Sequence, residues 1–360
     1  MRATYDVERA LEVLVRATQA TEKRVELRAR IELAFLRSVA GTDTAGELLE
    51  AAATSIPALE AAGDDRALGR AWLCIAHVKG GFYCDYGPAE ESALRAATYY
   101  RRAGWSPSSV LDLVGSALYY GPKPVPEAID HCKRLLREYE GDRASEANII
   151  VWLGGLEAMR KNFTDARAHV SHARTIYNEF GLTMAAIDTC GRVFASIDIL
   201  ADFPGDAERT LLECCASLQE RGQTAVLATR AGELAHAIYE QGRYEEAEVW
   251  TRLASSSAGT DDLDAALSWQ PVQAKIFARQ GKVGEAELLA RETLKLVSRS
   301  DSANRNADAC MTLAEILGIA DRQAEAEEAT RTALRLYEQK GNLASAGRAR
   351  ARLPHAALIE

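Results

Sequence analysis

The chain has 360 residues and a formal charge of −9, from 43 Lys and Arg against 52 Asp and Glu. Apolar residues make up 48%, enough for a substantial core, and nine prolines and 25 glycines are too few for a low-complexity chain. The acidic balance argues against a broad nucleic-acid-binding face, which needs surplus Lys and Arg to neutralise phosphates. Abundant alanine with only 7% aromatics favours helices over strands.

The N-terminal segment does not predict a signal peptide, because acidic residues begin at Asp6 and no apolar run follows. Nor does any stretch approach the ~18 consecutive apolar residues of a membrane span. The seven cysteines are odd in number and scattered through helix-like segments, which does not indicate a disulfide framework. We expect a cytoplasmic protein without membrane association.

One short motif recurs along the chain at nearly constant spacing. Its clearest copies end in an alanine at intervals of 41, 40, 39 and 40 residues, and less clear copies continue upstream at Ala128, Ala89 and Ala45. A helical pattern precedes and follows each alanine, as at 224–240 and 245–257. Each period therefore predicts one pair of helices. The clearest motif alanines are Ala166, Ala207, Ala247, Ala286 and Ala326.

Glycines often mark the boundaries between periods, since glycine just past a helix end accepts the left-handed conformation that terminates it. The chain opens near Tyr5 with what reads as the second helix of an incomplete unit. We expect one continuous domain of about eight helix pairs, followed by a capping helix and tail at 342–360. The predicted units are 1–63, 64–104, 105–141, 142–181, 182–222, 223–259, 260–300 and 301–341.

Two columns of mostly small residues repeat with the same period. Antiparallel helices pack at the short end of the 8–10 Å range only if the side chains between them are small, so both columns predict where paired helices touch. The column upstream of the motif contains Ser116, Gly154, Ala195, Ala235, Ala274 and Ala314. The column downstream contains Ala173, Cys214, Ala254, Thr293 and Ala333, with Leu135 as an exception.

The repeat resembles the tetratricopeptide repeat, most closely in LAHAIYEQGRYEEA at 234–247. Its period exceeds the usual 34 residues, which implies longer helices, and armadillo or HEAT units share a period near 40. The Gly-x-Tyr-x-x-Ala turn favours the tetratricopeptide alternative. The resemblance implies an all-α, right-handed superhelical solenoid whose first helices line a concave face.

A wider resemblance covers nearly the whole chain. GPKPVPEAI at 121–129, LEAMRKNFTDAR at 156–167, a Trp269/Lys275/Arg279/Gly281 pattern and LYEQKGN at 336–342 stand in this order. Together they are similar to the C-terminal helical-repeat region of bacterial signalling proteins with a class III adenylate/guanylate cyclase or transcriptional-activator domain followed by an ATPase module. This implies a regulatory role, with an upstream ATPase or cyclase domain or dimerisation.

The sequence contains no recognisable catalytic or metal motif. There is no Gly-x-x-x-x-Gly-Lys-[Ser/Thr] loop to hold nucleotide phosphates, and no nucleophile elbow. His169 and His172 have helical spacing but no second ligand cluster, and the Cys214–Cys215 pair falls at a packing position, which favours burial over redox chemistry. We therefore expect no enzyme activity, cofactor or bound metal.

A mixed polar and aromatic stripe is predicted on the concave face, and Tyr with Arg is a composition common at binding hot spots. We hypothesise that a protein or peptide partner binds there and is sensed by a regulatory module. The alternatives are a stand-alone receptor for a small ligand or signalling peptide, or a helical-repeat enzyme. The candidate residues are Tyr120, Asn148, Arg192, His236, Tyr239, Lys275 and Glu315.

Overall fold

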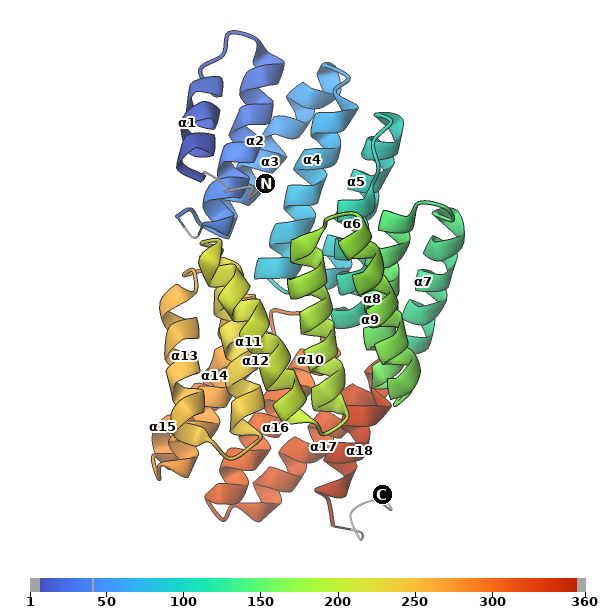
Figure 1. Ribbon diagram of the computed structural model, residues 1–360. Coiled ribbons are helices and arrows are strands. Elements are labelled where there is room, and N and C mark those ends of the chain that lie inside the picture. The colour runs from blue at the N-terminus through green and yellow to red at the C-terminus, as the bar shows by residue number, and fades with distance from the viewer. Residues whose placement is uncertain (1–6, 41, 355–360) are drawn as a thin grey trace.

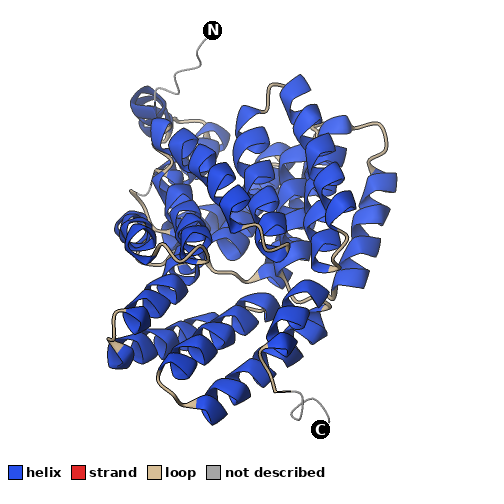
Figure 2. Ribbon diagram, turned by 60° about the horizontal axis from the view of Figure 1, so that its bottom comes forward, coloured by secondary structure: helices blue, strands red, loops and turns tan. Residues whose placement is uncertain are grey.

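The computed structural model describes residues 7–40 and 42–354, and every regular element in this part of the chain is a helix (Figure 2). The α-helices are α1 (Val7–Ala17), α2 (Lys23–Val39), α3 (Ala45–Ala61), α4 (Asp65–His77), α5 (Tyr86–Arg102), α6 (Ser108–Tyr120), α7 (Val125–Glu138), α8 (Arg143–Met159), α9 (Phe163–Glu179), α10 (Cys190–Leu200), α11 (Pro204–Glu220), α12 (Thr224–Tyr239), α13 (Tyr244–Ser257), α14 (Leu263–Arg279), α15 (Val283–Val297), α16 (Ala303–Ile319), α17 (Gln323–Lys340) and α18 (Leu343–Ala351). Two short π-helical segments are η1 (Val78–Phe82) and η2 (Ala185–Thr189).

Successive helices form pairs from α2/α3 to α16/α17, with α1 before the first pair and α18 after the last. Most first helices also pack on the first helix of a neighbouring pair, as α12 does on α14. Figure 1 shows the pairs stacking in chain order, from α1–α4 at one end to α16–α18 at the other. The chain is therefore an all-α, tetratricopeptide-like solenoid, as the repeat predicts.

A glycine followed by a capping side chain ends one unit and begins the next. Gly141 has φ of 90°, a conformation that glycine adopts without a Cβ clash, and it follows the end of α7. The carboxylate of Asp142 then accepts a hydrogen bond from the backbone N–H of Ser145 and caps α8. Gly341 and Asn342 repeat this arrangement between α17 and α18.

The small residues of the repeat allow the paired helices to approach closely. Ala166, Ala207, Ala247 and Ala286 are fully buried. At Gly154 on α8, an added Cβ would lie 2.8 Å from the carbonyl oxygen of Ala166 on α9, too close for any ordinary contact. Backbone against backbone cannot give way as a side chain can, so any larger residue at this position forces the two helices apart.

We expect Gly154→Ala to lower the free energy of unfolding by about 1–3 kcal/mol, because the methyl group overpacks the α8/α9 contact. Chemical denaturation monitored by circular dichroism measures the difference. Gly318→Ala is the matched control: Gly318 is also helical, an added Cβ there meets nothing within 4 Å, and alanine favours the helix by up to about 1 kcal/mol. Similar effects of both substitutions would contradict the close approach.

The superhelix is wound tightly enough that successive turns touch. The carboxylate of Asp261, before α14, accepts hydrogen bonds from the N–H groups of Ala45 and Gly46 at the start of α3. Asp301 accepts from Tyr86 and Gly87 at the start of α5 in the same way. These partners are 214 to 216 residues apart. A carboxylate at a helix N-terminus also complements the helix dipole, so each contact links one superhelical turn to the next.

Lys340 makes the third contact of this kind. Its side chain is fully buried, and its ammonium group donates hydrogen bonds to the carbonyl oxygens of Leu118, Gly121 and Lys123 at 3.1, 2.7 and 2.8 Å. The C-terminal helices therefore rest on the α6–α7 region. This closure encloses the space between the first helices of the units.

Candidate functional site: a central cavity

A cavity of about 620 Å³ lies along the inner face of the solenoid. Its wall is built mainly by first helices of the units, α6, α8, α10, α12, α14 and α16, and α18 closes one side. Apolar groups such as Ile199, Leu267 and Met311 alternate there with charged ones. This volume lies within the range of ligand-binding pockets in proteins.

Five of the seven candidate residues line this cavity: Tyr120, Arg192, His236, Lys275 and Glu315. They lie on α6, α10, α12, α14 and α16, so each first helix from α6 to α16 except α8 contributes one of them. The fold therefore places these five residues on one wall.

Asn148 does not line the cavity, contrary to the prediction for the stripe. Its amide nitrogen donates to the carbonyl oxygens of Ser108 and Ala144, and its amide oxygen accepts from the hydroxyl of Tyr177. The side chain is 6% exposed and fastens α8 to α6 and α9. Both polar atoms of its amide are therefore hydrogen-bonded within the fold.

Tyr239 also stands outside the cavity wall, where it supports two residues that face it. Its hydroxyl donates to Glu315 Oε1 at 2.6 Å and accepts from Arg279 Nε at 3.1 Å. Its ring lies 4.2 Å from the ammonium of Lys275, a cation–π contact. Tyr239 is therefore a positioning residue for Glu315 and Lys275.

One end of the cavity holds charges in balanced pairs. Lys275 Nζ donates to Glu240 Oε1 at 3.1 Å, and His236 lies 3.6 Å from the same carboxylate. Burial alone would raise the pKa of Glu240, but His236 and Lys275 outweigh it and lower that pKa to about 2. Burial, helped by Lys275, lowers the pKa of His236 to about 4. At neutral pH this end therefore presents a carboxylate, an ammonium group and a neutral imidazole.

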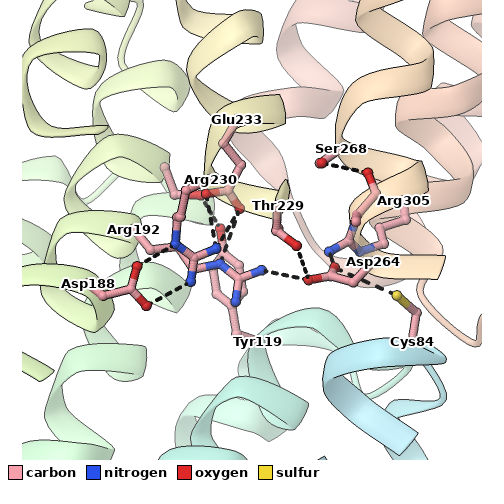
Figure 3. Close-up of polar contacts among 12 residues, drawn as sticks. Cys84, Tyr119, Asp188, Arg192, Thr229, Arg230, Glu233, Asp264, Ser268 and Arg305 are labelled. Carbon is pink, nitrogen blue, oxygen red and sulfur yellow. Dashed lines mark hydrogen bonds and ion pairs between the residues drawn. The ribbon is translucent and has the colours of Figure 1, made fainter. Parts of the chain in front are cut away.

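A cluster of three arginines and three acids borders the cavity through Arg192, Glu233 and Arg305, whereas its other members, Asp188, Arg230 and Asp264, lie outside the cavity wall (Figure 3). Asp188 accepts from Nε and Nη2 of Arg230 at 2.7 and 3.1 Å, and Glu233 accepts from both Arg230 and Arg192. These groups come from η2, α10 and α12. The cluster therefore links η2 and α10 to α12, the first helix of the next pair.

Asp264 on α14 joins this cluster to α16. Its carboxylate accepts a hydrogen bond from Arg305, lies 3.7 Å from Arg192 Nη2 and accepts from the hydroxyl of Thr229 (Figure 3). Its side chain is 8% exposed. A buried carboxylate at the meeting point of two guanidinium groups holds α10, α12, α14 and α16 in one register.

A second cavity of about 190 Å³ continues beyond this cluster toward η1 and α2. Tyr120 and Arg192 line both cavities and so belong to the wall between them. Asp112 and Asp262 face the second cavity, and burial raises the pKa of Asp262 to about 7. Asp112 accepts a hydrogen bond from Trp152 Nε1 at 2.8 Å.

His77 lines the second cavity, and its protonation is expected to destabilise the fold. Burial and the charge of Arg70 lower its pKa to about 4, and its ring packs against Phe35 and Phe82. Between pH 4 and 6.5 the unfolded chain therefore binds more protons at His77 than the native chain, so stability falls as pH falls through this window.

We expect His77→Phe to reduce the loss of stability between pH 7.5 and pH 5 by about 1 kcal/mol relative to the wild type. Urea denaturation of both proteins at the two pH values measures this difference. His172→Phe is the control, because His172 is exposed on α9. An unchanged pH dependence in His77→Phe would show that this imidazole titrates normally in the native state.

Sequence reasoning missed several residues of the cavity and cluster, among them Arg305, Asp264, Glu233 and Arg348. Charged residues within helix faces that otherwise read as buried were the available signal, as for Asp264 after Leu263 and before Ala265. A single sequence does not say whether such a charge is paired across the stack or solvated.

The described residues contain no group of three or more His, Cys, Asp or Glu positioned to hold a metal ion. His172 is exposed, and neither it nor His169 lines the larger cavity. Cys214 and Cys215 are each 1% exposed, and burial raises the pKa of both thiols to about 12. Thiols held protonated in this way are poor nucleophiles.

The fold and its cavity define the chain as a tetratricopeptide-like helical-repeat protein. No family model and no curated protein matches it. Among solved structures it is similar to a Rap protein complexed with competence and sporulation factor (13% identity, TM-score 0.48) and to the apo form of RapI (11%, 0.40), covering 96% of both chains in each case. It is also similar to the P58(IPK) TPR domain (14%, 0.26; 96% of this chain and 99% of that one). These similarities concern the fold alone.

In the part of the chain that the structure describes, no helix combines the length and apolar character needed to cross a bilayer.

Proposed function

We propose that the chain is a non-enzymatic regulatory module that binds a peptide or a peptide segment of a protein partner in the central cavity. The observation that carries this proposal is the composition of the cavity wall: apolar side chains, tyrosines and charges of both signs line one cavity of about 620 Å³. A peptide presents the same mixture of apolar side chains, polar backbone and charge.

Two alternatives remain, a receptor for a small ligand and a helical-repeat enzyme. The cavity volume suits a small ligand as well as a short peptide. The enzyme alternative has less support, because titratable groups of this cavity with shifted pKa values have internal partners: Glu240 pairs with Lys275, and Asp308 accepts a hydrogen bond from Tyr337. Such pairing accounts for the shifts without chemistry.

The wider context is also proposed. The motif order at 121–342 supports a place in a bacterial signalling protein of the ATPase and cyclase or activator type, in the cytoplasm, with an upstream catalytic domain or with dimerisation. We keep the proposal that 1–360 forms one continuous domain, since the helix pairs follow one another without a long linker. Binding would act on the parent protein by favouring one curvature of the solenoid.

The proposal is tested by affinity selection from a library of synthetic random pentapeptides. The wild type is expected to retain a defined subset, and a retained peptide at 100 times its Kd should stabilise the fold by about 2.7 kcal/mol in thermal unfolding. Ile199→Trp fills part of the cavity and should abolish retention of peptides. Val249→Trp is the control and should not affect retention, because Val249 on α13 is 56% exposed and does not line the cavity. Retention of no peptide, or equal retention by both variants, would overturn the proposal.

A further inference from the structure

Arg192 and Arg305, two of the four arginines that line the larger cavity, have N–H donors that no described residue uses. Arg192 donates through Nε to Glu233 at 3.2 Å, and its Nη2 lies 3.7 Å from Asp264, longer than a hydrogen bond. Arg305 donates through Nε to the hydroxyl of Tyr86 and through Nη2 to Asp264, which leaves its Nη1. Each guanidinium carries five N–H groups, so both retain free donors.

The free donors open to the cavity rather than to apolar core. Among the described residues, only Ser38 Oγ and Trp72 Nε1 are fully buried side-chain polar atoms without a partner. Arg192 and Arg305 line the larger cavity, and their side chains are 15% and 13% exposed. The remaining N–H groups therefore face the cavities: Arg305 lines the larger one, and Arg192 lines both.

The ring of Tyr120 contacts both guanidinium groups. The carbon Cζ of Arg192 lies 4.7 Å from the centre of this ring, and that of Arg305 lies 5.3 Å from the same centre. The ring is itself stacked on Tyr86 at 5.4 Å with an interplanar angle of 23°. Acid partners on one side and aromatic rings on the other fix both groups before any ligand arrives, which lowers the entropic cost of binding.

The other arginine of the cluster lacks this opening. Arg230 uses Nε and Nη2 on Asp188 and Nη1 on Glu233. It lines the second cavity and not the larger one. Arg348 and Arg352 also line the larger cavity, and Arg348 donates to the carbonyl of Ile199 and lies 3.7 Å from Asp202. The cation–π contacts with Tyr120, however, are made by Arg192 and Arg305.

We propose that Arg192 and Arg305 bind a carboxylate of the peptide ligand in the larger cavity, an inference that rests on the proposed function. A planar guanidinium matches a carboxylate with two parallel N–H donors, and such charge-assisted hydrogen bonds are among the strongest in proteins. The cluster contains three arginines and three acids, so orientation of free donors, rather than surplus charge, selects the carboxylate. The group comes either from the peptide C-terminus or from an Asp or Glu side chain.

The test uses the pentapeptide library in two forms, free acids and C-terminal amides. If the C-terminus binds, free acids should be retained at least tenfold better than the matching amides. If a side chain binds, both forms should be retained equally, and changing the selected Asp or Glu to Asn or Gln should weaken retention at least tenfold.

Variants then assign the effect to these residues. Arg192→Lys and Arg305→Lys keep the charge but lose the planar guanidinium, and each should reduce the carboxylate preference at least fivefold. Arg243→Lys is the matched control and should leave the preference unchanged, because Arg243 pairs with Glu208 and Glu246 outside the cavity. Thermal unfolding shows which variants fold. The ratio of retained free acid to retained amide, and of retained Asp peptide to retained Asn peptide, is measured on the wild type, so the test does not depend on a variant that folds. Peptides retained without any carboxylate preference would overturn this inference and leave the proposed function standing. Retention of no peptide would overturn both.

Discussion

Replacing Lys340 by methionine is expected to lower the free energy of unfolding by about 3–5 kcal/mol. Methionine has a similar length, but it leaves the carbonyl oxygens of Leu118, Gly121 and Lys123 without the ammonium donor that reaches all three. Each unsatisfied buried carbonyl costs about 1–3 kcal/mol, partly relieved by local rearrangement. Urea denaturation gives the loss, and amide hydrogen exchange should show new opening in the α6–α7 region, about 220 residues away in sequence.

Lys295→Met is the control for this prediction. Lys295 lies in the last turn of α15 with an exposed side chain, so its replacement should change stability by no more than about 0.5 kcal/mol. If the two variants are equally stable, the contact between superhelical turns contributes nothing to folding. If Lys340→Met is destabilised but hydrogen exchange at α6–α7 is unchanged, the effect is confined to α17.

The helix pairs were predictable because their signals are local and periodic. A buried alanine such as Ala247 and the turn that precedes it repeat at nearly constant spacing, so one copy predicts the next. The contacts between turns were not predictable in this way. Asp262 caps α14, whereas its neighbour Asp261 accepts hydrogen bonds from the start of α3. The winding of the superhelix, which no single repeat encodes, decides that pairing.

The candidate site shows the same division. First-helix positions extrapolated from the shorter standard repeat placed Tyr120, Arg192 and Lys275 on the cavity wall. Asn148 does not line the cavity, and its amide is instead hydrogen-bonded to Ser108, Ala144 and Tyr177. A partner such as Tyr177, 29 residues away on the next helix, is not visible in the spacing of the repeat.

Asp264→Ala is expected to destabilise the protein by about 3–5 kcal/mol. The substitution removes the carboxylate shared by Arg305, Arg192 and Thr229 and leaves two guanidinium groups in a poorly solvated wall. Breaking one partner of a buried ion pair costs this much because the remaining charge has lost its compensation. Thermal and urea denaturation at neutral pH measure the loss.

A double variant separates the uncompensated charge from the loss of packing. Asp264→Leu with Arg305→Met removes both partners and should be more stable than Asp264→Leu alone, since an apolar pair of similar volume replaces an orphaned charge. Glu246→Ala serves as the surface control: it breaks an ion pair with Arg243 in which both side chains are more than 40% exposed, and should cost no more than about 1 kcal/mol. If Asp264→Ala costs no more than Glu246→Ala, the cluster is solvated like a surface pair and does not hold α14 against α16. A large loss of stability that Arg305→Met restores would instead show that the charges of the cluster compensate one another. That compensation is what keeps the unused N–H donors of Arg192 and Arg305 fixed in place at the cavity wall.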